Sequence, residues 1–198
     1  MLTIACVQVG NYEGRGAEYV DRLRSMVSRH LSLPHRFVCL GEADLPERGW
    51  WGKLYMFKAF SPGERVVYFD LDTVIVGSID ELCSFDGEFG SLGDFRPPHG
   101  GRIGSALMAW RGGFGSFIYD EWVRAGKPYH PGGDDWWLNR LFDGKPIPIR
   151  LNRRYRGQIV SYKFDHCRAA FPEGARVVCY QRRPKPHECE GWVKDHWR

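Results

Sequence analysis

Two aspartates separated by a single residue, Asp70 and Asp72, carry the strongest chemical signal in the sequence. They come directly after the apolar run 66–69, and a second, largely apolar run, 73–76, follows them. Carboxylates set between apolar segments are costly to bury without a positive partner, and residues i and i+2 of an extended chain project to the same side. Carboxylate oxygens suit Mg²⁺ or Mn²⁺, which keep coordination positions open for substrate phosphates. The pair therefore predicts Mn²⁺ or Mg²⁺ as a cofactor, next to a phosphate-bearing substrate.

The segments that must position this pair alternate between strand and helix in the first half of the chain. Strand-like apolar runs at 3–9, 36–40 and 66–69 are separated by helix-like segments at 17–31 and 51–60. This order predicts an α/β fold with a parallel sheet covered by helices. Because ligands of such sheets bind beyond the carboxyl ends of the strands, the loops after the first and third strands are the expected site.

The second half of the chain is less regular. Ser78 and Glu81 have the spacing of a capping box that would open a short helix at 79–83. Because the sequence contains no internal repeat and no linker-like stretch, we expect residues 1–198 to form one domain. Further strands are expected at 89–92, 106–111, 158–164 and 176–181, and further helices at 116–125 and 134–142.

Composition narrows the class of protein. The 198 residues are 43% hydrophobic and 15% aromatic, which is typical of a folded domain rather than a disordered chain. No apolar run approaches the ~18 residues that span a bilayer, and the first residues lack the basic flank of a signal peptide. The six cysteines are scattered without a CxxC pair, which favours reduced thiols over a disulfide framework or a zinc site. We therefore expect a cytoplasmic protein that does not cross a membrane.

An Asp-x-Asp pair after a buried strand is typical of two enzyme classes. Residues 67–72 resemble the nucleophile motif of haloacid-dehalogenase-type phosphohydrolases, and Lys127 and Asp134 resemble the later Lys and acidic motifs of that class. Only six residues separate Lys127 from Asp134, whereas that fold places a helix and a strand between these motifs. Its nucleophile strand also opens the domain, but here two strands and two helices come first. This class remains an alternative.

The second class is the nucleotide-sugar glycosyltransferases, and the chain resembles the GT-A members around family 8 at several ordered positions. The segments that carry the resemblance are WWGKLYMF at 50–57, VYFDLDTVIVGSIDEL at 67–82, IGSALMAW at 103–110, GDDWWLN at 133–139 and VCYQRRPKP at 178–186. The resemblance spans about residues 3–187. It implies a mixed, mostly parallel sheet flanked by helices, a UDP-linked sugar donor and transfer with retention of anomeric configuration. The acceptor is left open between a glycan, a lipid-linked glycan and a protein.

The resemblance also implies roles for individual residues. Asp70 and Asp72 match the acids that hold the metal and contact the ribose, and the metal offsets charge on the departing diphosphate. Lys53 matches a cation that helps to hold the donor, and Lys185 matches one that contacts the diphosphate. Tyr12, in the loop after the first strand, could stack on the base or simply pack within its loop. The other donor-binding residues carried over are Gly10, Asn11 and Ser105, and the expected catalytic residues, on the loop that contacts donor sugar and acceptor, are Asp134 and Asp135.

The sequence departs from the family pattern at the expected third metal ligand. Cys179 stands where the family has a His, and a thiolate is a soft, poor ligand for Mn²⁺ or Mg²⁺. Gln181, His187 or water are the alternatives for that ligand. Arg182 replaces a Gly whose bare backbone approaches phosphate closely. These departures keep a second function open, that of a catalytically impaired protein that binds a nucleotide sugar on the same fold.

The charge of the chain is unevenly distributed. Residues 1–149 hold 16 basic and 19 acidic residues, net −3, whereas residues 150–198 hold 12 basic and 5 acidic residues, net +7. We expect this basic segment to close over the donor site. The basic residues between 150 and 156 would suit an anionic acceptor, and no nucleic-acid-binding motif accompanies them, so nucleic acid is not an expected partner. The clamp on the diphosphate is expected to consist of Lys163, Arg182, Arg183 and Lys185, the two lysines being donor-binding residues.

Overall fold

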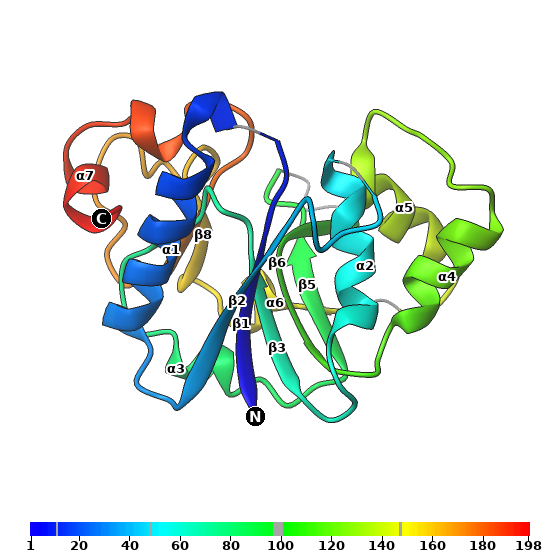
Figure 1. The fold of residues 1–198 in the computed structure, drawn as a ribbon. Helices are drawn as coiled ribbons and strands as arrows, with labels where there is room; N and C mark the ends of the chain where they lie inside the picture. Colours follow the sequence, from blue (N-terminus) through cyan, green and yellow to red (C-terminus); the bar gives the residue numbers. More distant parts are fainter. Residues whose placement is uncertain (11, 48, 97–100, 147) are drawn as a thin grey trace.

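The computed structural model describes the chain except for residues 11, 48, 97–100 and 147. The strands of its central sheet are β1 (Leu2–Gln8), β2 (His35–Gly41), β3 (Arg65–Phe69), β5 (Phe89–Gly93), β6 (Ile103–Arg111) and β7 (Ile149–Arg150). They lie in the order β2-β1-β3-β6-β5-β7, with helices on both faces (Figure 1). Three of the five pairings are parallel, and the two made by β6 are antiparallel. This is the mixed, mostly parallel α/β sheet that was predicted from the sequence.

One face of the sheet is covered by α1 (Gly16–His30), which lies beside β1 and β2 in Figure 1. Tyr19, Leu23 and Met26 on this helix are fully buried. Residues three and four positions apart lie on the same side of a helix, so these side chains form one apolar stripe. The stripe packs into a core with side chains of β1 and β3. The predicted order of strand, helix, strand, helix and strand is confirmed.

The opposite face of the sheet carries α2 (Gly52–Ala59), α4 (Ser116–Arg124) and α5 (Gly133–Leu141) (Figure 1). A one-turn 3-10 helix, η2 (Gly49–Trp51), leads directly into α2. These helices pack on a second apolar core, in which the rings of Phe57 and Trp110 lie 5.0 Å apart. The amino-terminal ends of α2 and α5 lie close together, because Lys53 and Asp134 in their first turns are 3.5 Å apart.

A small second sheet ties the last quarter of the chain to the centre of the molecule. Its strands are β4 (Val74–Ile75), β8 (Ile159–Ser161) and β9 (Val177–Cys179), in the order β4-β9-β8. β4 comes directly after the aspartate pair and is antiparallel to β9. Beyond β9, the chain forms η3 (Pro186–Glu188) and α7 (Trp192–His196) next to α1 (Figure 1). Both expected strands in this region are shorter than predicted.

The predicted capping box is wrong. The short helix, α3 (Asp80–Cys83), begins at Asp80 and has no side-chain cap of the expected kind. Instead the Asp80 carboxylate accepts hydrogen bonds from the N–H and hydroxyl of Ser32, at 2.7 and 2.8 Å. The Ser78 hydroxyl also donates to the Asp80 carboxylate at 3.2 Å and accepts from the N–H of Asp80 at 3.3 Å, but it bonds no residue of the next turn. The side chain at the start of α3 is therefore bonded mainly by Ser32, which comes from the loop after α1, and not by a residue of its own first turn.

The aspartate pair lies in a turn and not in an extended chain, so the strand argument for their common side is wrong. β3 ends at Phe69, and the N–H of Thr73 donates to the carbonyl of Asp70 at 3.0 Å. This hydrogen bond closes a turn over residues 70–73. The charge of Asp70 nevertheless acts on Asp72 and helps to raise its pKa, after burial, so the turn keeps the two carboxylates near each other.

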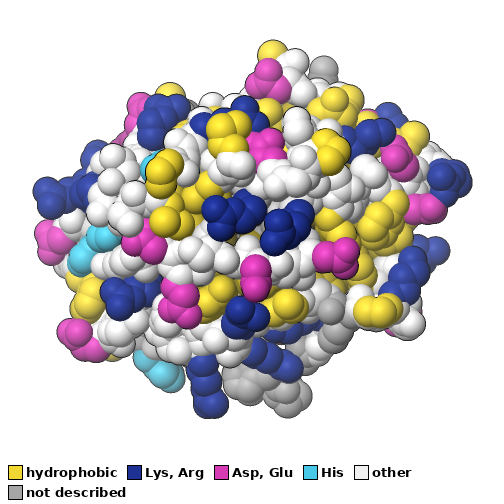
Figure 2. Space-filling view, turned by 90° about the horizontal axis from the view of Figure 1, so that it is seen from below, with side chains coloured by type: hydrophobic (Ala, Val, Ile, Leu, Met, Phe, Trp, Pro, Cys, Tyr) yellow, Lys and Arg dark blue, Asp and Glu magenta, His cyan; other side chains and the backbone are white. Residues whose placement is uncertain are grey.

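The end of the sheet remote from this turn presents a mixed surface. Figure 2 shows basic and acidic side chains interspersed on this face. Within the ranges that the structure describes, no helix has both the length and the apolar character needed to cross a membrane.

Candidate functional site

At the carboxyl end of β3, the ammonium group of Lys53 joins two carboxylates. Its Nζ lies 2.7 Å from Oδ1 of Asp70 and 3.5 Å from Oδ2 of Asp134. Asp70 directly follows β3 and also accepts a hydrogen bond from the hydroxyl of Tyr68, at 2.5 Å. Lys53 belongs to the first turn of α2, and Asp134 belongs to the first turn of α5. Two helices and a central strand therefore meet at this point.

A second lysine, Lys185, reaches the other aspartate from the far end of the chain. Its Nζ lies 2.5 Å from Oδ2 of Asp72, a residue that is only 6% exposed. Lys185 directly precedes η3, and the pairing of β9 with β4 holds this part of the chain beside the aspartate turn. The structure thus brings together two residues that the sequence resemblance assigned to one site.

β6 positions the carboxylates of α5. The N–H of Ser105 donates to Oδ1 of Asp135 at 2.7 Å, and the Ser105 hydroxyl lies 3.4 Å from Nζ of Lys53. One turn further along α5, the Asn139 side chain bonds both the N–H and the carbonyl of Ile103, each at 2.8 Å. Asn139 was not singled out from the sequence, although it stands four residues after Asp135, one helical turn away. It ties the helix to the part of β6 that carries Ser105.

Three acids of this cluster, Asp72, Asp134 and Asp135, have a pKa above that of an ordinary carboxylate. Burial, and then the charge of Asp70, raise the pKa of Asp72. Burial also raises the pKa of Asp134, even though Lys53 opposes the shift. Asp135 keeps an exposed side chain, but the closely packed atoms around it and the charge of Asp134 raise its pKa to about 6. The cluster therefore carries more negative charge than its surroundings stabilise.

A charge count supports a divalent cation. Among the described residues of this cluster, the four carboxylates face two ammonium groups, which leaves two negative charges when every acid is ionised. Burial alone would lower the pKa of Lys53, but the carboxylates of Asp134 and Asp70 raise it above its ordinary value. One Mg²⁺ or Mn²⁺ ion would balance the surplus, and Asp70 and Asp72 are the residues that would hold it.

The candidates for a third protein ligand are engaged elsewhere. Cys179 is fully buried, and burial together with the two nearby aspartates raises the pKa of its thiol, which disfavours the thiolate. Oε1 of Gln181 accepts a hydrogen bond from Ser161, and Nδ1 of His187 shares one with Tyr19, each at 2.5 Å. In the described part of the chain, no three His, Cys, Asp or Glu side chains converge to hold a metal. The residues fit an ion that binds two carboxylates and takes its other ligands from phosphate and water.

The loop after β1 lies beside the aspartates. The ring of Tyr12 packs 5.0 Å from that of Tyr19, and burial, followed by the charges of the two aspartates, raises the pKa of its phenol. The N–H of Gly10 donates to Oε1 of Glu42 at 3.1 Å. Tyr12 therefore packs against Tyr19 of α1 and also lies near Asp70 and Asp72. Asn11 lies outside the described residues.

The expected basic clamp is only partly gathered at the aspartates. Lys163 follows β8 with an exposed side chain, and its ammonium lies 5.8 Å over a neighbouring phenylalanine ring, so its contact with a donor stays a prediction. Arg183 forms an ion pair with Glu188. Arg182 adopts a φ of 62°, in the left-handed region that favours glycine. This conformation agrees with the Gly that the family pattern has at this position.

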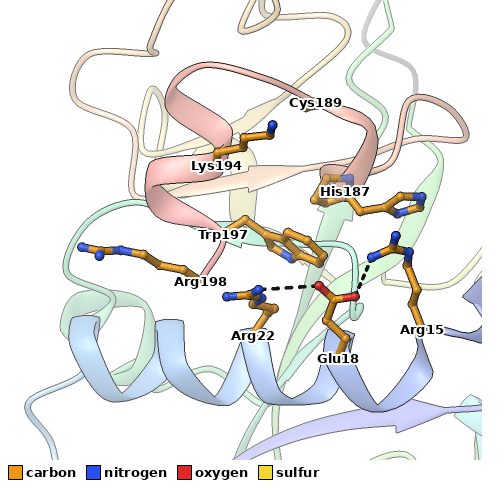
Figure 3. A pocket seen from close by; sticks show the side chains of 9 residues that line it. Arg15, Glu18, Arg22, His187, Cys189, Lys194, Trp197 and Arg198 are labelled. Atoms are coloured by element: carbon orange, nitrogen blue, oxygen red, sulfur yellow. Dashed lines mark hydrogen bonds and ion pairs between the residues drawn. The ribbon is translucent and has the colours of Figure 1, made fainter.

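Other basic residues of the last quarter face α1. They border an open pocket of about 270 Å³ between α1 and the end of the chain, with Lys194, Trp197 and Arg198 on one side (Figure 3). On the α1 side, Glu18 lies between two arginines, 2.8 Å from Nη1 of Arg15 and 3.6 Å from Nη2 of Arg22 (Figure 3). Part of the positive charge of residues 150–198 is therefore held away from the aspartates.

The two motifs that suggested a phosphohydrolase lead to separate places. Nζ of Lys127 lies 2.6 Å from Oε1 of Glu47, whereas Asp134 faces Lys53. The lysine that pairs with Asp70 is thus the one that the glycosyltransferase resemblance predicts.

Solved structures that resemble the chain are glycosyltransferases. Apo GlyE of Streptococcus pneumoniae TIGR4 matches with a TM-score of 0.67 and 15% identity, over 100% of this chain and 59% of GlyE, so the chain spans about three fifths of its length. The galactosyltransferase LgtC, in complex with donor and acceptor sugar analogues, matches with a TM-score of 0.66 and 14% identity, over 98% of this chain and 93% of LgtC. The bifunctional WbbM matches with a TM-score of 0.64 and 13% identity, over 93% of this chain and 46% of WbbM. No protein-family model and no curated protein sequence matches the chain.

These sequence identities are too low to carry a shared activity, but the likeness in three dimensions covers nearly all of this chain. The mixed sheet with helices on both faces agrees with the fold expected from the sequence motifs. The chain has the GT-A glycosyltransferase fold.

Proposed function

We propose that the chain is a metal-dependent glycosyltransferase that moves a sugar from a UDP-linked donor to an acceptor. The observation that carries this proposal is the cluster after β3, where Asp70 and Asp72 lie with two lysines and the carboxylates of α5. A divalent cation would offset the negative surplus of the cluster and would provide a positive partner for a diphosphate. The fold of LgtC, solved with donor and acceptor sugar analogues, supports the substrate class.

In this proposal each polar residue of the cluster has one task. Asp70 and Asp72 hold Mn²⁺ or Mg²⁺, which would offset the negative charge of the departing diphosphate. Lys185, which pairs with Asp72, would turn to the diphosphate when the aspartate has a cation to bind. Lys53 orients Asp70 and neutralises Asp134. The transfer would proceed with retention, and the leaving diphosphate would accept the proton of the acceptor hydroxyl.

The remaining assignments concern the walls of the site. Ser105, Asp134 and Asp135 would face the donor sugar and the acceptor, and Gly10 and Tyr12 would face the nucleotide. Residues 1–198 would act as one domain in which 150–198 covers the donor. The contact between Lys185 and Asp72 and the pairing of β9 with β4 support this arrangement.

Release of UDP tests the proposal. With Mn²⁺, the protein should release UDP from at least one of UDP-glucose, UDP-galactose and UDP-N-acetylglucosamine, with water as a slow acceptor. Asp70→Asn should lower this rate at least about a hundredfold, because the stabilisation of the leaving group by the metal is worth several kcal/mol. Asp120→Asn is the control, because Asp120 is an exposed acid that pairs with Lys58 on the surface.

Two other outcomes would replace the proposal. Binding of UDP-sugars without any release of UDP would favour the impaired binding protein, which the buried Cys179 at the expected ligand position makes the second candidate. Mg²⁺-dependent release of phosphate from p-nitrophenyl phosphate, without release of UDP from the sugars, would favour a phosphohydrolase.

A further inference from the structure

A tryptophan lies half in solvent at the rim of the carboxylate cluster. Trp50 is 48% exposed, although Trp side chains are on average highly buried. It belongs to η2, which continues directly into α2. Residues three positions apart are neighbours on a helical surface, so Trp50 lies on the side of this segment that carries Lys53. The exposed indole is therefore near the ammonium that joins Asp70 to Asp134.

The indole also contacts the start of α5. A Cβ placed on Gly133 would lie 2.8 Å from Cδ1 and 2.9 Å from Nε1 of Trp50, closer than real side chains come. Gly133 has a φ of 59°, in the region that glycine adopts without strain. Asp134 follows it and lies 3.5 Å from Lys53. The close approach of Trp50 to Gly133 thus sets the indole beside the carboxylates of α5.

An aromatic pair borders the same turn. The ring of His130 stacks on Trp136, with centroids 4.6 Å apart and 8° between the planes. A Cβ on Gly132 would lie 3.0 Å from each of these side chains. The two consecutive glycines therefore lie against the Trp50 indole on one side and against His130 and Trp136 on the other, and the exposed Asp135 lies in the first turn of the helix that follows. Aromatic surface and carboxylates meet at one rim.

This combination has the chemistry that recognises a saccharide. One face of a pyranose ring consists of C–H groups, which pack flat on an indole, and its edge carries hydroxyls, which donate hydrogen bonds to carboxylates. Binding sites commonly pair an aromatic wall with a few polar groups that fix orientation. A polypeptide acceptor typically binds along a free strand edge or in a groove, and a lipid chain binds on a broad apolar patch. Trp50 instead offers one ring-sized surface next to Asp134 and Asp135.

We propose that Trp50 is the platform on which a saccharide acceptor stacks its terminal ring, with the ring hydroxyls directed to the exposed Asp135. The inference rests on the proposed transferase function, because it assigns the acceptor of that same site.

Saturation-transfer NMR with simple glycosides tests this acceptor site. The probes are methyl β-galactoside, methyl β-glucoside and methyl N-acetyl-β-glucosaminide, each added to the protein with UDP and the diamagnetic ion Mg²⁺. At least one should bind the wild-type chain, with the strongest saturation on the protons of one ring face. Trp50→Ala should weaken its Kd roughly tenfold, and Trp50→Phe should restore most of the affinity. Phe117→Ala is the matched control, because Phe117 is a 39% exposed aromatic residue on α4.

The same variants separate this inference from the proposed function. Each variant is also tested for the rise in Tm that UDP and Mn²⁺ produce, which Trp50→Ala should retain. A wild-type rise in Tm without binding of any glycoside would overturn the acceptor site and leave the donor site standing. Equal glycoside binding by wild-type and Trp50→Ala, or an equal loss in Phe117→Ala, would also overturn it. Glycoside binding that depends on Trp50, without a rise in Tm, would support the saccharide site and contradict the donor.

Discussion

Replacement of Lys53 by methionine would leave Asp70 and Asp134 without the ammonium that joins them. Its Nζ lies 2.7 and 3.5 Å from the two carboxylates, and its side chain is only 13% exposed. At an effective dielectric constant of about 20, unit charges at these distances attract by about 6 and about 5 kcal/mol. In the variant, rehydration of the carboxylates and proton uptake by them recover part of this lost attraction energy. Breaking a buried ion pair therefore typically costs about 3–5 kcal/mol. For a domain of this length, the expected fall in Tm is about 6–20 °C.

Lys58→Met is the matched control, since Lys58 lies on the same helix and loses the same charge. Its Nζ is also 2.7 Å from a carboxylate, that of Asp120, but the two side chains are 38% and 44% exposed. An exposed pair contributes about 0–1 kcal/mol, so the Tm of this variant should stay within about 4 °C of the wild type. Thermal unfolding followed by circular dichroism in metal-free buffer measures both variants.

The destabilisation in Lys53→Met should also depend on pH. Burial raises the pKa of Asp134, and the pKa of Asp135 is about 6; loss of the ammonium raises both further. At pH 5 these acids take up protons and little charge stays unpaired, whereas at pH 8 the charges remain. The deficit relative to wild type should therefore be larger at pH 8 than at pH 5. An equal loss of Tm in Lys53→Met and Lys58→Met, or a deficit that is the same at both pH values, would refute this account of the cluster.

Three further predictions follow from the same contacts. Lys185→Met should weaken UDP binding in the presence of Mn²⁺ by about 10- to 100-fold, as expected for a lost charge-assisted hydrogen bond. Lys194→Met is the control and should leave UDP binding unchanged, because the Lys194 side chain is 59% exposed; calorimetry measures both variants. Asp135, with its pKa raised to about 6, binds more protons in the folded than in the unfolded state between about pH 4 and 6, so stability falls as pH rises through that window. Asp135→Asn should accordingly gain Tm relative to wild type between pH 4 and pH 7, and parallel melting curves at the two pH values would contradict this. Asn139→Ala should lower the free energy of unfolding by about 1–3 kcal/mol and speed hydrogen exchange at the N–H of Ile103, because both side-chain bonds from Asn139 to Ile103 are lost; unchanged exchange would show that other contacts protect this N–H.

The first half of the fold and the centre of the site were predictable from local pattern. Three apolar runs separated by two amphipathic segments leave few topologies, and the acids after the third run must then lie at the carboxyl end of the sheet. Lys53 was predictable only through the family resemblance, because its spacing from Asp70 says nothing about contact. Tyr68 was not singled out from the sequence, although it stands two residues before Asp70 and its hydroxyl bonds the Asp70 carboxylate.

The rest depends on contacts between distant segments. Arg150 belongs to a basic run that suggested an anionic partner, yet it is buried and donates to the hydroxyl of Ser91 at 3.2 Å and to the carbonyl of Gly101. Nothing local distinguishes it from an exposed arginine such as Arg153. The capping box failed for a similar reason, because Ser32 supplies donors that no pattern near residue 80 reveals. Strand lengths in the small sheet are likewise set by how far neighbouring strands pair, which is three residues for β8 with β9 and two for β4 with β9.

The most direct test of the central claim is the Mn²⁺ dependence of UDP binding, measured by isothermal titration calorimetry. The variant is the double substitution Asp70→Asn and Asp72→Asn, and the control is Asp120→Asn. If the two aspartates hold a divalent cation for a diphosphate, Mn²⁺ should tighten UDP binding by wild type and control at least about tenfold, or about 1.4 kcal/mol, and should leave the affinity of the double variant unchanged. Equal UDP affinity of the wild type with and without Mn²⁺, or a Mn²⁺ effect that persists in the double variant, would contradict the claim.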